Sequence, residues 1–347
     1  MNDSRRRKGL RLERARASAQ FKDGKFENPS GAGPTMTKGS TLPVLGEFFF
    51  RRGRREPPAP LPVVRPHETW ARQSDTGLRV TWLGHSTVLL ELDGRRVLTD
   101  PVFGERASPV SFAGPLRFHP VPAALDELPP LDAVLLSHDH FDHLCAPTIE
   151  ALARTRVPIV TPLGVGALLE ALGVDPARIT ELDWHERAEI GGVRFTATPS
   201  QHFSGRGPTS RNATLWASWV IETERRKVFF SGDTGLFPGF EDIGKQHGPF
   251  DLVMLEVGAY HPAWGTIHLG PENALTALEM LGGGTLLPVH WGTFNLALHD
   301  WDEPAETLLS LATERGARVV TPQIGAAFEP ERVGAPTPWW RSVASPR

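Results

Sequence analysis

The chain has 347 residues, 40% of them apolar, which is enough for a sizeable core in one large domain or two smaller ones. Its 37 basic and 40 acidic residues give a formal net charge of −3, which argues against broad nucleic-acid binding. The only cysteine, Cys145, excludes an internal disulfide and a zinc site built from cysteines.

Residues 1–75 form the first distinct region. They are rich in Arg, Pro, Gly and Ser and show no sustained hydrophobic period, which predicts an extension that lies partly on the body and is partly disordered. Within it, the apolar residues 42–50 (LPVLGEFFF) precede the basic run 51–55 (RRGRR). These runs predict either a segment docked on the domain surface or an apolar wedge with a basic collar that meets a membrane surface.

The same region bears on the compartment. The basic run 4–8 resembles the start of a secretory signal, but charged side chains, among them Arg11 and Arg14, occupy the place of the apolar segment. No stretch approaches the roughly 20 apolar residues that span a bilayer. We therefore expect a cytoplasmic protein, with a peripheral position at the inner membrane surface as the alternative.

From residue 76 onwards, strand and helix patterns alternate. Apolar runs at 78–83, 87–92 and 95–99 predict strands, and Asp93-Gly94 predicts a hairpin turn between the last two. Helices are predicted at 146–154, 164–172, 271–281 and 304–314. Further strands are predicted at 158–161, 193–198, 216–222, 227–231, 252–256, 286–289 and 318–320. This order predicts an α/β (α+β) domain of stacked mixed sheets flanked by helices over residues 76–335, followed by a tail at 336–347.

The densest chemical signal is the run 138–143 (HDHFDH), which holds three histidines and two aspartates directly after the largely apolar run 131–137. Imidazole and carboxylate bind divalent transition metals, and a strand that ends in such a run brings several of them to one point. A chance cluster of polar residues in a surface turn is the alternative reading.

Three more candidate ligands argue against chance. His202, Asp233 and His290 each follow a predicted strand, and strand ends hold ligands well because the sheet fixes their positions. Together with the run 138–143 they supply five histidines and two aspartates, more than the four ligands of one tetrahedral zinc ion. The pattern predicts two adjacent divalent metal ions that share a carboxylate, and hydrolysis by metal-bound hydroxide.

This HxHxDH run, followed by His, Asp and His at strand ends, resembles the signature of the metallo-β-lactamase superfamily. The resemblance implies an αβ/βα sandwich of two mixed β-sheets flanked by helices, with a binuclear site at one edge. It implies that the first metal is held by His138, His140 and His202. It implies a second metal held by Asp142, His143 and His290, with Asp233 bridging the two. Zn²⁺ suits such ligands, and Fe or Mn could occupy them.

Further segments resemble one branch of that superfamily, the N-acylphosphatidylethanolamine-hydrolysing phospholipase D branch. They are 81–87 (TWLGHST), 98–103 (LTDPVF), 106–109 (RASP), 114–118 (GPLRF), 199–202 (PSQH), 243–245 (IGK), 248–251 (GPFD) and 290–294 (HWGTF). The resemblance implies attack on the phosphorus of a phosphodiester, with release of phosphatidic acid and an N-acylethanolamine. The implied partner is a phospholipid or another small-molecule ester.

Two alternatives stay open. A lactonase similar to the ascorbate-6-phosphate lactonase branch, or another small-molecule metallo-hydrolase, would use the same ligand set. A membrane-surface or scaffold protein would keep the metal for structure, although the open ligand set argues against it. Residues 42–50 with Trp216, Trp219 and Trp264 favour a lipid substrate over a sugar lactone, unless these aromatic side chains belong to the core.

Residues around the ligands receive narrower roles. We predict that Asp142 serves catalysis as a ligand and His268 as a general acid or substrate-binding group, since imidazole titrates near neutrality. The resemblance implies substrate contact for Phe141, at a position where the branch usually has Tyr. Three residues are expected behind the ligands, as structural groups or orienters of ligand imidazoles: His85, Asp100 and Asp139.

Overall fold

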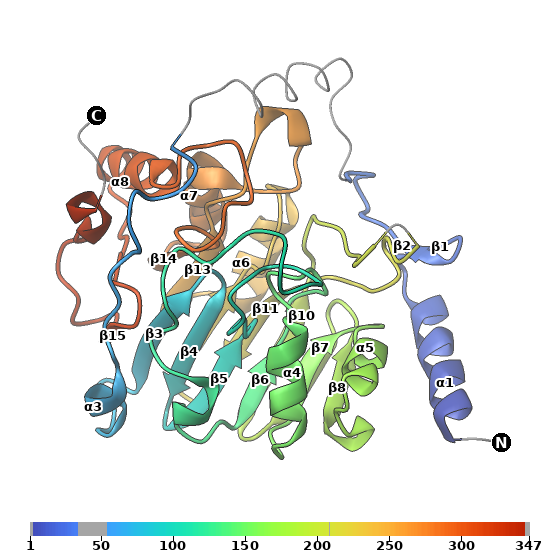
Figure 1. Cartoon of the computed structure of the whole chain (residues 1–347). Coiled ribbons are helices and arrows are strands. Elements are labelled where there is room, and N and C mark those ends of the chain that lie inside the picture. Colours follow the sequence, from blue (N-terminus) through green and yellow to red (C-terminus); the bar gives the residue numbers. More distant parts are fainter. Residues whose placement is uncertain (1–2, 34–53, 208, 344–347) are drawn as a thin grey trace.

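The computed structural model describes residues 3–33, 54–207 and 209–343 of the chain. Residues 42–50 and the basic residues 51–53 lie outside this part, so both interpretations of that segment stay predictions. Figure 1 shows two β-sheets stacked against each other, with helices on their outer faces. None of the described helices is long and apolar enough to cross a bilayer.

The first sheet has seven strands in the order β15-β3-β4-β5-β6-β7-β8. Its antiparallel part consists of β15 (Ala327–Phe328), β3 (Leu78–Gly84), β4 (Thr87–Leu92) and β5 (Arg95–Thr99). Its parallel part continues from β5 through β6 (Ala133–Leu135), β7 (Ile159–Pro162) and β8 (Ile179–Leu182). Asp93 and Gly94 both have positive φ in the turn between β4 and β5, as this dipeptide favours.

The second sheet has six strands in the order β14-β13-β12-β11-β10-β9. Its antiparallel strands are β9 (Arg187–Ile190), β10 (Val193–Thr198) and β11 (Ser218–Glu222). β11 pairs antiparallel with β12 (Lys227–Phe230), which begins a parallel run through β13 (Leu252–Glu256) and β14 (Thr285–Val289).

Helices cover the outer faces of both sheets. The first sheet carries α4 (Ala146–Ala153) and α5 (Gly166–Ala171), and the second carries α6 (Gly239–His247), α7 (Gly270–Met280) and α8 (Glu303–Arg315). A single turn, α3 (His67–Trp70), precedes β3. Short 3₁₀ turns occupy 125–127, 176–178, 262–264 and 339–342.

The start of the chain packs on this body through α1 (Asp3–Ala17) and the two-stranded pair β1 (Phe21–Lys22) and β2 (Lys25–Phe26). Arg11 of α1 forms ion pairs with Glu170 and Glu181 beside β8. Phe26 is fully buried in the main core. The helix contains few apolar side chains, so these ion pairs, rather than an apolar stripe, hold it to the domain.

The alternation of side chains along the first sheet builds two separate cores. In β4, Val88, Leu90 and Leu92 pack between the sheets, whereas Leu89 faces the helices α4 and α5. The same alternation sends Leu135 of β6 to the inner core and Val134 to the outer one. Because successive strand residues point to opposite faces, a strand covered on both sides must be apolar throughout.

The predicted fold class, two mixed sheets flanked by helices, is confirmed. The predicted helix 304–314 matches α8 within one residue at each end. The strands β8, β9 and β15 were not predicted, because they are short and their half-exposed side chains form no apolar run. The predicted strand 318–320 is wrong in extent, since only an isolated bridge joins Val319 to Leu286.

The strand directions place the residues predicted to bind metal at one edge of the two sheets. In the first sheet, β3 and β5 run in the same direction because both pair antiparallel with β4, and β6 runs parallel to β5. In the second sheet, β10 and β12 run in the same direction because both pair antiparallel with β11, and β13 and β14 run parallel to β12. The loops that follow these strands gather above the sheets in the view of Figure 1. Every histidine or aspartate predicted to bind metal lies in one of these loops.

Candidate metal centre

All seven predicted donors converge at this edge of the sheets. They fall into two groups, and within each group one ligand atom per residue lies within 4.8 Å of the others. The first group is His138, His140, His202 and Asp233. The second group is His85, Asp142, His143 and His290. This division agrees with the one that the resemblance implied, with His85 as an addition.

Three imidazoles meet in the first group. His138 Nε2 lies 2.8 Å from His140 Nδ1, and His202 Nε2 lies 3.3 Å from the same nitrogen. His138 and His202 are buried. Three ring nitrogens this close cannot all carry protons that face one another, so the arrangement favours a shared cation.

In the second group the imidazoles surround Asp142. Its Oδ2 lies 3.0 Å from His85 Nε2, 3.3 Å from His290 Nε2 and 3.5 Å from His143 Nε2. His85 was expected behind the ligands, and the structure brings its ring into direct contact with one of them. His85 directly follows β3, so the strand-end pattern that indicated His202, Asp233 and His290 was also a signal for it.

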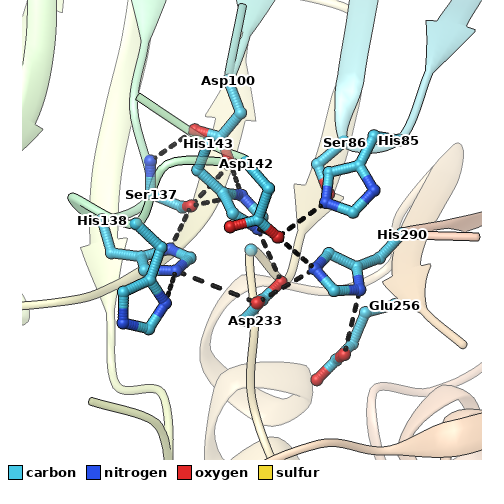
Figure 2. A network of polar contacts seen from close by, with 12 residues as sticks. His85, Ser86, Asp100, Ser137, His138, Asp142, His143, Asp233, Glu256 and His290 are labelled. Atoms are coloured by element: carbon cyan, nitrogen blue, oxygen red, sulfur yellow. Dashed lines mark hydrogen bonds and ion pairs between the residues drawn. The ribbon is translucent and has the colours of Figure 1, made fainter. Parts of the chain in front are cut away.

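Asp233 lies between the two groups (Figure 2). Its Oδ1 lies 3.2 Å from His143 Nε2, and its Oδ2 lies 3.1 Å from His290 Nε2. The same Oδ2 is 3.7 Å from His202 Nε2, on the other side. The carboxylate therefore reaches both groups, which is the geometry that a bridging ligand requires.

Polar contacts behind the donors fix their orientation. His143 Nδ1 lies 2.6 Å from Asp100 Oδ2, and Asp100 also accepts hydrogen bonds from the backbone N–H and hydroxyl of Ser137 (Figure 2). Asp100 thus orients a ligand imidazole, as expected. For Asp139 the contacts fit the structural alternative, because its carboxylate accepts a hydrogen bond from the backbone N–H of Gly205.

The backbone of the site is strained where it turns inward. His85, Asp100 and His290 have φ of 51°, 33° and 64°, values that non-glycine residues rarely adopt. Gly232, also at positive φ, precedes Asp233, and a Cβ on it would lie 2.5 Å from the Cβ of Ser137. This glycine allows the Asp233 loop of the second sheet to touch the 138–143 loop of the first.

The two groups differ in how burial and neighbouring carboxylates shift the pKa values of their imidazoles. Burial holds the pKa of His138 and of His202 well below the ordinary value for imidazole. Burial also opposes protonation of His290, but the carboxylates of Asp233 and Asp142 outweigh it and raise the pKa of this imidazole to about 10. The acidic side of the centre therefore attracts positive charge, which a bound cation would supply in place of protons.

The residues fit a pair of divalent ions. Among the described residues, the buried atoms His143 Nε2 and Asp233 Oδ1 form no hydrogen bond, although they lie 3.2 Å apart. A buried polar atom without a partner costs about 1–3 kcal/mol, and an ion bound between these atoms would remove that cost. Nitrogen and carboxylate oxygen are also the donors that zinc, iron and manganese accept.

Two residues assigned to the substrate side lie beside this centre. One ligand atom of His268 lies within 4.8 Å of ligand atoms of Asp233 and His290. Phe141 is half-buried, and the guanidinium of Arg206 lies 4.0 Å above its ring. The sequence pattern missed Glu256, the last residue of β13, whose buried carboxylate contacts His268.

Comparisons with known proteins agree with this geometry. The family model of the β-lactamase superfamily domain matches residues 95–291, more than half of the chain. The chain belongs to the metallo-β-lactamase superfamily. The matched segment carries all seven donors, because it extends from β5 to the residue after His290. The chain is accordingly a metal-dependent hydrolase of this superfamily.

Similar proteins indicate which branch of the superfamily this chain resembles. The chain is 38% identical to an N-acyl-phosphatidylethanolamine-hydrolyzing phospholipase D of Caenorhabditis elegans, over 70% of this chain and 72% of the worm protein. It is 45% identical to an uncharacterized protein of Mycobacterium tuberculosis, over 93% of this chain and 88% of that protein. These matches support the branch that the sequence segments indicated.

Solved structures support the fold alone. An isothiocyanate hydrolase from gut bacteria of Delia radicum superposes with a TM-score of 0.59 at 22% identity, covering 72% of this chain and 98% of that protein. The same sandwich fold therefore occurs in enzymes with different substrates, so the fold alone does not identify the substrate of this chain. The substrate must be argued from the surroundings of the metal centre.

We predict that metal content follows the two groups. The purified protein should bind about two zinc ions per chain, and His202→Ala and Asp142→Ala should each remove about one, since each loses a ligand of a different ion. Asp233→Ala should weaken both. Metal analysis after dialysis against limiting zinc measures this, with His247→Ala, at the end of α6, as a matched control. Equal loss of both ions in His202→Ala would contradict the division into two groups.

Proposed function

We propose that this chain is a two-metal phosphodiesterase of the phospholipase D type, acting on lipids similar to N-acyl phosphatidylethanolamine. The observation that carries the proposal is the pair of donor groups, with the carboxylate of Asp233 in contact with residues of both. The identity to the worm phospholipase D adds support, because it extends over 70% of the chain.

The ligand roles are part of this proposal. The first ion would be held by His138, His140 and His202, the second by Asp142, His143 and His290, and Asp233 would bind both. Zn²⁺ is our choice of metal, since imidazole and carboxylate suit it, and Fe or Mn would accept the same donors. When bound, two such ions supply a water of lowered pKa and positive charge for a phosphodiester.

In the proposed reaction the oxygen of water bonds to phosphorus and the bond from phosphorus to the ethanolamine oxygen breaks. The products are phosphatidic acid and an N-acylethanolamine, whose oxygen must gain a proton as it leaves. His268 is our candidate donor, because it lies beside Asp233 and His290 and is not needed as a ligand. Phe141 would line the substrate side of the centre, with its ring held by Arg206.

A cavity on the far side of Phe294 from the centre supports a lipid substrate. It has a volume of about 500 Å³, and its apolar wall includes Leu116, Trp264, Leu296 and Leu298. Leu296 packs beside Phe294, whose ring centroid is 5.4 Å from that of His85. Phe294 therefore lies between this cavity and the second donor group. The wall also includes the charged side chains of Arg55, Glu56 and Arg106, so the cavity offers both apolar and charged contacts, as a phospholipid requires.

The rim of this cavity also supports contact with a membrane surface. Three large apolar side chains are exposed on one short loop, Val110 at 38%, Phe112 at 82% and Leu116 at 51%. Arg106 closes this loop by hydrogen bonds to the carbonyl groups of Ser111 and Gly114. An exposed apolar loop with a basic residue at its base is typical of a protein that inserts side chains at the level of lipid headgroups.

A substrate panel tests the proposed function. Zinc-loaded protein should release an N-acylethanolamine from N-acyl phosphatidylethanolamine in vesicles, and chelation of the metal should abolish the release. The same preparation should open lactones slowly. Intact lipid together with rapid opening of a lactone would replace the phosphodiesterase by a lactonase.

We predict that His268→Ala lowers kcat about 100-fold, the effect typical of removing a general acid, while two ions stay bound. The measurement is turnover of N-acyl phosphatidylethanolamine together with zinc content. A substrate with a leaving group that needs no proton, such as 4-nitrophenol, should lose much less activity. Unchanged turnover in both assays would remove His268 from the mechanism.

We predict that Phe112→Ser and Leu116→Ser weaken action on vesicles and spare soluble substrates. Loss of an inserted side chain forfeits about 1.5–3 kcal/mol, which corresponds to tenfold or more in vesicle affinity. Turnover on vesicles and on a soluble phosphodiester should be compared for each variant. Val64→Ser is the control, because Val64 is 38% exposed outside this loop. Equal losses on both substrates would mean that the loop is structural.

A further inference from the structure

Glu256 is a fully buried carboxylate at the end of β13, between the strands whose loops carry Asp233 and His290. In the described part of the chain, no Lys or Arg side chain forms an ion pair with it. A buried carboxylate is costly unless other groups satisfy its charge. Its partners are therefore informative, and they lead to the metal centre.

The two oxygens of Glu256 have separate tasks. Oε1 accepts hydrogen bonds from the backbone N–H groups of Thr234, at 2.8 Å, and Leu269, at 3.2 Å. Thr234 follows Asp233, and Leu269 follows His268. Oε2 lies 2.7 Å from Nδ1 of His268. The two backbone contacts prevent the carboxylate from turning, so Oε2 faces the imidazole in a fixed position.

This contact determines which nitrogen of His268 is available. A carboxylate accepts protons and does not donate them, so the proton of the pair is held on Nδ1. Nε2 is then the nitrogen left to meet a substrate, and in the protonated ring it carries the second proton, which is the one that can pass to a leaving oxygen. The contact holds the ring beside His290, whose own Nδ1 is 3.9 Å from Glu256 Oε2 (Figure 2).

We propose that Glu256 is a positioning residue: its Oε2 holds the Nδ1–H of His268, so that Nε2 faces the substrate and is the nitrogen from which the protonated ring gives its proton to the leaving oxygen. The inference rests on the role of His268 in the proposed function. The same carboxylate ties the His268 ring to the backbone beside Asp233, so the proton donor and the bridging ligand share one anchor. A purely structural carboxylate would hold the two backbone N–H groups and leave the histidine tautomer undetermined.

The tautomer can be observed directly. The zinc-loaded full chain, labelled with ¹⁵N in histidine, should give ring signals typical of a protonated Nδ1 for His268, and these signals are assigned by their loss in His268→Ala. Glu256→Gln keeps an oxygen for Thr234 and Leu269 but presents an amide N–H to Nδ1. The proton should then move to Nε2. An unprotonated Nδ1 in the unmodified protein would overturn the proposal.

Kinetics supply the second test, with bis(4-nitrophenyl) phosphate and N-acyl phosphatidylethanolamine as substrates. Glu256→Gln should lower kcat on the lipid about 10–100-fold, the usual effect of losing a partner behind a functional imidazole, with KM and zinc content nearly unchanged. The double variant with His268→Ala should be no slower than His268→Ala alone. Losses that multiply would contradict action through His268.

Controls separate this inference from the proposed function. Glu91→Gln also neutralises a buried carboxylate, but that side chain pairs with Arg79 and Arg96 on the first sheet, so kcat should not change. The spectra need no substrate, so a protonated Nδ1 in a protein inactive on phosphodiesters would reject the function and keep the positioning role. If Glu256→Gln does not fold, the spectrum of the unmodified protein still decides.

Discussion

The convergence of five imidazoles and two carboxylates on one buried edge is the constraint on which the rest of the structure depends. In water these groups would be solvated, and in the protein most of them are almost completely hidden. Their mutual contacts satisfy only part of their hydrogen-bonding capacity, as His143 Nε2 and Asp233 Oδ1 demonstrate. Divalent cations remove this conflict because they neutralise the carboxylates and accept the imidazole lone pairs at the same time. Folding at this edge and metal binding are therefore coupled.

The sandwich supplies what such a convergence needs. Each sheet contributes strands that end at the same edge, and the two sheets meet where Gly232 lies against Ser137 without a side chain between them. The backbone then turns sharply at His85, Asp100 and His290, at a cost of about 1–3 kcal/mol for each strained residue. The apolar cores on both sides of the first sheet stabilise the strands that hold these turns in place.

The sequence predicted the parts of this arrangement that are local. A strand followed by a histidine or aspartate is visible within ten residues, and all seven donors were found in this way. Glu256 was missed because it reads as the end of an apolar strand, and its partner His268 is twelve residues away. The exposed loop around Phe112 was missed for a similar reason, since exposure depends on what the rest of the fold covers. The ion pairs of Arg11 with Glu170 and Glu181 join segments that no local pattern connects.

The difference between local patterns and contacts across the fold also separates the reaction type, which the donors indicate, from the substrate specificity. The donor set is common to hydrolases of this superfamily, so it determines how a bond is broken and says little about which bond. In the proposed function the substrate would be selected by the wall of the nearby cavity, which is assembled from the loop that carries Leu116, the turn that carries Trp264 and the segment after His290. These three pieces come from both sheets, and two of them are continuous with residues at the metal centre: Trp264 leads to His268, and Leu296 follows Phe294 beside His85. Under the proposed function, a change in the wall near Trp264 would also move the segment that carries His268, and so it would couple the choice of lipid to the rate of the reaction.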